Sequence, residues 1–75
     1  MKTIYDQRYR AAINYLKEAR KRNGLSQAQV AEKLNVPRVR ITKIESCDRR
    51  LDILELSQIL KLYGVAMADV EAQLK

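Results

Sequence analysis

Two short helical segments lie between residues 25 and 46 with a break of about three residues between them, and this feature limits the possible folds most. The first segment begins at Ser26, a favoured helix N-cap. The second begins at Pro37, which suits a first helical turn because its missing N–H is not needed there. Asn35 stands in the break, where we expect a positive φ, which Asn tolerates better than other non-glycine residues. The predicted inward face consists of Leu25, Val30, Ala31, Leu34, Val36, Ile41 and Ile44.

The rest of the chain shows the apolar spacing of three and four residues that is typical of helices. One helix is predicted from an N-cap at Asp6, preferred over Thr3, to a stop at Asn23-Gly24. Another is predicted from the N-cap Asp52 to Gly64, and a last one over about residues 67–73. In the helix after Asp52 the predicted inward residues are Ile53, Leu56, Ile59, Leu60 and Tyr63.

We therefore predict one all-α domain of five helices over residues 1–75. Residues 1–5 form an N-terminal extension in this prediction, and the last two helices occupy about residues 52–73. The two short helices and their tight turn, at about residues 25–46, form a helix-turn-helix arrangement.

The charge of the chain is uneven. The 15 Lys and Arg residues outnumber the nine Asp and Glu residues, which gives a net charge of +6. Residues 1–50 carry 13 basic and 5 acidic side chains, a balance of +8. Residues 51–75 carry 2 basic and 4 acidic side chains, a balance of −2. A basic surface of this kind is typical of nucleic-acid binders, although charge alone would equally suit a membrane surface or an acidic protein.

The composition argues against several kinds of site. Cys47 is the only cysteine and His is absent, so we expect no disulfide framework, no Cys/His zinc site and no cofactor. The lack of His also removes the commonest general base. Because no paired carboxylates, phosphate-binding loop or nucleophile–base pair can be assembled, we expect no enzymatic activity. For Cys47 itself, a redox-sensing role competes with that of an ordinary loop thiol, and its neighbours Asp48 and Arg49 favour the ordinary thiol.

The sequence also argues against a membrane location. Its longest purely apolar run, at residues 65–68, is four residues long, whereas a membrane span needs about 20. The N-terminus has one Lys but no apolar stretch behind it, unlike a secretory signal. A role on a membrane surface is disfavoured because the apolar helix faces are needed for a core. We therefore expect a cytoplasmic protein.

Several motifs, taken together, resemble the XRE/Cro-type helix-turn-helix family of phage repressors and bacterial regulators. The motifs are LSQAQVAEKLNV at residues 25–36, ITKIE at 41–45, DILEL at 52–56 and YGV at 63–65. The resemblance covers about residues 10–70, and the first two motifs are specific at this separation. It implies a five-helix domain, nucleoid-associated in a bacterium or phage, with the second helix of the motif in the DNA major groove.

The resemblance also implies roles for individual residues. Arg and Lys suit guanine O6 and N7, and an apolar side chain suits the thymine methyl group. The implied base contacts are Arg38, Val39, Thr42 and Lys43, and the implied phosphate contacts are Ser26, Gln27, Arg40, Ser46, Arg49 and Arg50. The alternative for the basic residues is a solvated helix face, and for Gln27 an ordinary polar residue of a first helical turn.

Three positions depart from the family pattern. Pro37 replaces a Ser or Thr that often caps the recognition helix, and Ala66 stands where a capping Ser is frequent. Cys47 stands where the family usually has Gly. Since a side chain would strain a left-handed conformation there, we expect this loop to differ from that of the family.

Two further predictions concern packing. Arg20 and Glu45 could be interpreted as a catalytic or charge-relay pair, but the resemblance implies a buried structural ion pair between the first and third helices. The C-terminal helices carry more apolar residues than a small core requires; core filling accounts for some of them, and the rest predict a dimer interface. The predicted interface residues are Leu54, Leu62, Met67, Val70 and Leu74.

The leading functional hypothesis is a transcriptional regulator, a repressor that binds a palindromic operator in double-stranded DNA as a homodimer. The bound dimer would act sterically by blocking polymerase. The alternative is an antitoxin-type module that binds a toxin protein and also regulates its own operon, using the last two helices as the toxin-binding surface.

Overall fold

The computed structural model describes residues 3–75, and this part of the chain is helical without any strand. The elements are a 3-10 turn η1 (Thr3–Tyr5) and five α-helices: α1 (Gln7–Arg22), α2 (Gln27–Leu34), α3 (Arg38–Glu45), α4 (Ile53–Tyr63) and α5 (Met67–Gln73). The predicted all-α fold with five helices is confirmed.

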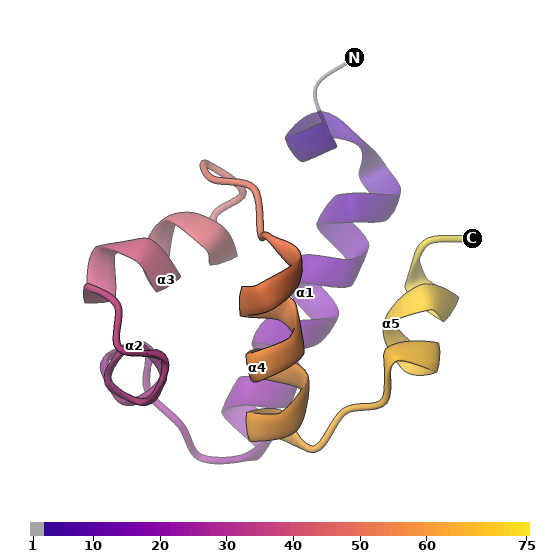
Figure 1. Cartoon of the computed structure of the whole chain (residues 1–75). Helices are drawn as coiled ribbons and strands as arrows, with labels where there is room; N and C mark the ends of the chain where they lie inside the picture. Colours follow the sequence, from indigo (N-terminus) through magenta and orange to yellow (C-terminus); the bar gives the residue numbers. More distant parts are fainter. Residues whose placement is uncertain (1–2) are drawn as a thin grey trace.

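The longest helix, α1, is the element around which the others pack. It contacts α3, α4 and α5, while α2 packs mainly against α3. Figure 1 shows α2 and α3 on one side of the domain and α5 on the other, with α4 between them. The helix-turn-helix therefore forms one side of the molecule.

The helix ends follow the predicted caps. Asp6 caps α1 by accepting a hydrogen bond from the Arg8 backbone N–H (2.8 Å), and its hydrogen bonds with the Arg8 guanidinium lower the pKa of Asp6 to about 2. Ser26 and Asp52 begin α2 and α4, each in a reciprocal capping box with the residue three positions later. Asn35 ends α2 in the left-handed conformation (φ 57°), as predicted.

The core lies where α1 meets the other helices. Ala19 of α1 and Val30 of α2 are completely buried, and Tyr63 of α4 lies in the same cluster. Burial raises the pKa of the Tyr63 hydroxyl to about 12. The end of α1 is tied to the end of α4 because the Asn23 side-chain amide donates to the Ala19 carbonyl (2.8 Å) and the Tyr63 carbonyl (3.0 Å). This contact between helices was not predicted from the sequence.

The loop after α3 corrects the expectation for Cys47. Cys47 adopts the left-handed conformation (φ 61°), and its backbone N–H donates to the Ile44 carbonyl (3.1 Å). The thiol is buried in a small cluster with Ile13 and Ile44. A left-handed non-glycine residue costs about 1–2 kcal/mol, and burial of this side chain offsets part of that cost. The loop keeps its left-handed turn, and Cys47 lies in this loop with its thiol buried in the core.

The face of α4 also differs from the prediction. Ile53, predicted to point inward, is 81% exposed, and its neighbour Leu54 is 75% exposed. The buried residues Glu55, Ile59 and Tyr63 recur every four positions and define the inner face of the helix. Ile53 lies two residues before Glu55, about 200° around the helix, so it points away from the core.

Two of the predicted dimer-interface residues belong to the fold of the single chain. Val70 is 4% exposed and packs in the main core, where α5 covers α1, so its assignment to a dimer interface was wrong. Leu62 is half-buried and packs against the same core. The other three, Leu54, Met67 and Leu74, are exposed.

Val70→Asp should therefore unfold the domain, because it would place an unpaired carboxylate in the core. We expect a loss of at least about 3 kcal/mol in the free energy of unfolding, measured by thermal denaturation with circular dichroism. Ala72→Asp is the matched control, since this substitution adds the same charge at an exposed position of α5. Equal melting temperatures for the two variants would place Val70 outside the core.

Candidate nucleic-acid interface

The turn between α2 and α3 sets the relative position of the two helices. Ser26 Oγ accepts from the Gln29 backbone N–H (3.0 Å), and Gln29 Oε1 accepts from the Ser26 backbone N–H (2.8 Å), which completes the capping box of α2. At the other end, the left-handed Asn35 allows the Val36 N–H to reach the Ala31 carbonyl (2.9 Å). The chain then enters α3 at Pro37, which supplies no side-chain cap.

A buried ion pair connects α1 to α3, as predicted. Arg20 Nε and Nη2 donate to the two carboxylate oxygens of Glu45 (2.6 and 3.0 Å), and both side chains are 9% exposed. Arg20 Nη1 also donates to the Leu25 carbonyl at the entry to α2 (2.7 Å). The hydrogen bonds that Arg20 donates to Glu45 raise the pKa of Arg20. One guanidinium thus fixes the positions of three helices.

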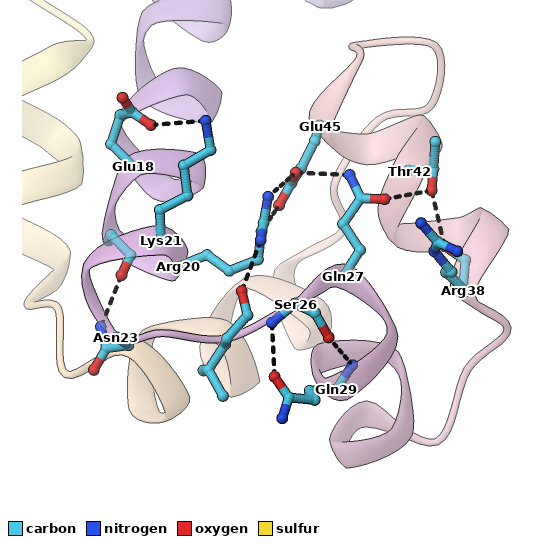
Figure 2. Close-up of polar contacts among 12 residues, drawn as sticks. Glu18, Arg20, Lys21, Asn23, Ser26, Gln27, Gln29, Arg38, Thr42 and Glu45 are labelled. Atoms are coloured by element: carbon cyan, nitrogen blue, oxygen red, sulfur yellow. Dashed lines mark hydrogen bonds and ion pairs between the residues drawn. The ribbon is translucent and has the colours of Figure 1, made fainter.

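The same carboxylate holds Gln27, the first residue of α2. Gln27 Nε2 donates to Glu45 Oε1 (3.0 Å), and Gln27 Oε1 accepts from the Thr42 hydroxyl (2.8 Å). Figure 2 shows these side chains as one chain of contacts from Arg20 through Glu45 and Gln27 to Thr42. Two of the predicted DNA contacts, Gln27 and Thr42, are therefore in direct contact with each other.

The remaining predicted base contacts lie on the outer side of α3. Arg38 and Lys43 are exposed, and Val39 is 57% exposed although it is apolar. Among residues 3–75, neither Arg38 nor Lys43 has an acidic side chain within ion-pair distance. Their charges remain available to an external anion.

Arg49 and Arg50 extend this basic surface into the loop after α3. Both are exposed, and neither forms an ion pair with any residue in the described part of the chain. The Tyr9 hydroxyl accepts a hydrogen bond from the Leu51 backbone N–H (2.9 Å) and so anchors the end of this loop to α1. Burial raises the pKa of Tyr9. No feature of the sequence predicted the contribution of Tyr9.

Two predicted phosphate contacts have partners within the protein. Arg40 Nη1 donates to Glu55 Oε2 (2.8 Å), and the Glu55 side chain is 8% exposed. The Ser46 hydroxyl faces two acceptors, Asp48 Oδ2 (2.8 Å) and the Lys43 carbonyl (3.2 Å). Since a hydroxyl has one proton, Ser46 in this conformation has none left for a phosphate. The Arg40 charge is matched by Glu55, so its principal observed role is to join α3 to α4.

The Arg40–Glu55 contact was not predicted from the sequence. Its one signal was the Asp52-x-x-Glu55 spacing of a capping box, which places Glu55 at the start of α4. That spacing explains the hydrogen bond from the Asp52 backbone N–H to Glu55 Oε1 (3.2 Å). It does not indicate that the second carboxylate oxygen would pair with Arg40.

Comparison with known proteins assigns this arrangement to a family. The helix-turn-helix family HTH_3 matches residues 16–70, which include all of α2, α3 and α4 and parts of α1 and α5. The chain belongs to this XRE-type helix-turn-helix family. No curated protein matches the sequence.

Family membership establishes the general activity. The helix-turn-helix protein is a DNA-binding transcriptional regulator, and its family is generally non-enzymatic. Among the described residues, no helix is long and apolar enough to span a membrane. The exposed outer side of α3 is the surface that such a motif places against DNA.

Arg20→Ala should destabilise the fold because it leaves the Glu45 carboxylate buried without its partner. We expect a loss of about 3–5 kcal/mol in the free energy of unfolding, measured by denaturant titration. The double variant Arg20→Met with Glu45→Leu is the control, since replacing both charges by apolar side chains should recover much of that loss. Full stability of Arg20→Ala, accompanied by weaker DNA binding, would instead make Arg20 a phosphate contact.

Proposed function

We propose that this protein is a transcriptional repressor that binds a palindromic operator as a homodimer, with α3 of each subunit in the major groove. The observation that carries the proposal is the outer side of α3, where Arg38, Val39 and Lys43 are exposed beside Arg49 and Arg50. Arg and Lys donate to guanine O6 and N7, and Val39 supplies a contact for a thymine methyl group. Repression would be steric, through occlusion of polymerase.

The start of α2 supports a phosphate contact. Ser26 uses its hydroxyl oxygen as an acceptor within the capping box, which leaves its proton available to a phosphate oxygen. Gln27 uses one amide hydrogen on Glu45, which leaves the second for the same purpose. The positive end of the α2 dipole favours an anion at this position.

The need for a second copy follows from the size of the domain. A single module buries about 600–1,000 Å² on DNA, which is small for typical nanomolar specificity. Two modules on half-sites about one helical turn apart provide the missing contacts. The +8 half of the chain faces DNA in this proposal, so the −2 half, with exposed Leu54, Met67 and Leu74, is the surface for self-association.

DNA binding should depend strongly on salt if basic side chains neutralise phosphates. The logarithm of the binding constant should fall with the logarithm of the salt concentration, with a slope of about −0.9 per phosphate contact. Arg50→Ala should weaken binding to all sequences equally and reduce the slope by about 1, whereas Arg38→Ala should relax one base position at a cost of about 1–3 kcal/mol. Fluorescence anisotropy with a DNA sequence selected from a random pool, and with its single-base variants, measures the salt slope, the uniform loss for Arg50→Ala and the position-specific loss for Arg38→Ala.

Two outcomes of that experiment would contradict the proposal. A binding constant that does not change between low and high salt would exclude phosphate neutralisation. Equal losses on all sequences for Arg38→Ala and Arg50→Ala would show that Arg38 does not contribute to sequence recognition.

The dimer should be weak in solution and strengthened by DNA. Leu54→Asp should leave the fold intact, because residue 54 is 75% exposed, and should abolish cooperative occupation of the two half-sites. Asn14→Asp adds the same charge to an exposed position of α1 and is the control. Titration of paired and single half-sites measures the cooperativity, and its persistence in Leu54→Asp would exclude Leu54 from the interface.

A second candidate function is an antitoxin that binds a toxin and its own operator. The observation in its favour is the exposure of two adjacent apolar residues, Ile53 and Leu54, which together offer an apolar contact to a partner protein. A toxin gene in the same operon, together with a stable complex of the two proteins in size-exclusion chromatography, would favour this candidate over homodimeric repression.

A further inference from the structure

The Thr42 hydroxyl lies between two hydrogen-bond acceptors. Its oxygen is 2.8 Å from Gln27 Oε1 and 3.3 Å from the Arg38 carbonyl oxygen (Figure 2). A hydroxyl group has one proton and two acceptor lone pairs. Whichever neighbour receives the proton, the proton is used within the protein, and the shorter contact favours Gln27.

The orientation of the Gln27 amide is set by Glu45. The Glu45 carboxylate is fixed by the two hydrogen bonds from Arg20, and as a carboxylate it can only accept. The side of the Gln27 amide that faces Glu45 must therefore be the NH₂ group, as observed at 3.0 Å. Rotation of the amide by 180° would place the Gln27 oxygen against Glu45, so the amide oxygen is held toward Thr42.

The polarity of the whole chain of contacts is therefore determined in the protein interior. Arg20 donates to Glu45, Glu45 accepts from Gln27, and Gln27 accepts from Thr42. At the exposed end, Thr42 is left with acceptor lone pairs and its methyl group. A threonine at an exposed helix position can normally either donate to its partner or accept from it. Thr42 can only accept, because its proton is already used within the protein.

We propose that Thr42 determines specificity as a fixed acceptor, selecting adenine or cytosine at the base that it faces. In the major groove, adenine presents the N6 amine and cytosine the N4 amine, whereas guanine presents O6 and N7 and thymine presents O4. Only the amines can donate to Thr42, and the other groups would place acceptor against acceptor. The inference rests on the proposed placement of α3 in the major groove. It adds which bases can form a hydrogen bond with Thr42.

The test starts from sequences selected from a random DNA pool by the parent protein and by three variants. Thr42→Val keeps the shape and the methyl group but removes the oxygen, so we expect the preference for adenine or cytosine at one position to fall about tenfold. Thr42→Ser retains the oxygen without the methyl group and should restore that preference. Gln27→Met removes the nearer acceptor and leaves only the longer contact to the Arg38 carbonyl (3.3 Å) to compete for the Thr42 proton, so guanine and thymine should become better tolerated at the same position.

The outcomes separate this inference from the proposed function. If the parent selects a defined sequence but Thr42→Val selects the same one with equal preference at every position, the inference is wrong and the proposed function stands. It is equally wrong if Thr42→Val relaxes a position where the parent prefers guanine or thymine, or if Gln27→Met leaves the relative preference among the four bases at that position unchanged. A uniform loss over all sequences in Gln27→Met is the effect expected from its proposed phosphate contact and is separate from this preference. If the folded parent selects no sequence, the proposed function fails and the inference with it. Thermal denaturation of each variant verifies that it is folded.

Discussion

The buried ion pair of Arg20 with Glu45 is the interaction on which the arrangement of the other elements depends. It joins α1 to α3 directly, reaches the entry of α2 through the Leu25 carbonyl and holds Gln27 through Glu45. A buried ion pair contributes little net stability, because desolvation of two charges offsets their attraction. Its effect here is geometric, because every side-chain nitrogen of Arg20 and both carboxylate oxygens of Glu45 have a hydrogen-bond partner within the protein. The orientation of α3 relative to α1 and α2 follows from these fixed partners.

Two groups among the basic residues differ in a way that the net charge does not show. Arg8, Arg20 and Arg40 are each paired with a carboxylate within the chain. Arg38, Lys43, Arg49 and Arg50 are exposed and have no acidic partner among residues 3–75. Pairing removes a charge from the long-range field of the protein, so the second group dominates the potential that DNA would experience at α3 and the following loop.

Local signals explain why the helices could be predicted so closely. The helix caps act through backbone groups within four residues, and each adopts the predicted conformation; they are Asp6, Ser26, Asp52 and Asn35.

Side-chain contacts between distant residues were harder to predict. Ile53 and Val70 were misassigned because apolar spacing does not specify which side of a short helix faces the core. The Arg40–Glu55 and Tyr9–Leu51 contacts join residues 15 and 42 positions apart, and such pairs depend on tertiary packing.

The connection of Thr42 to the interior constrains how recognition by α3 can change. Arg38, Val39 and Lys43 project from the helix without a side-chain partner in the described structure, so a substitution there alters the outer surface alone. For the Thr42 hydroxyl to donate toward DNA, its proton would have to leave the Gln27 oxygen, whose position is set by Glu45 and Arg20. A change of polarity at Thr42 would therefore require a compensating change at Gln27, and Gln27 is itself held by the buried pair. In the proposed complex with DNA, base preference at Thr42 would consequently be coupled to the buried ion pair, whereas at Arg38, Val39 and Lys43 it would not.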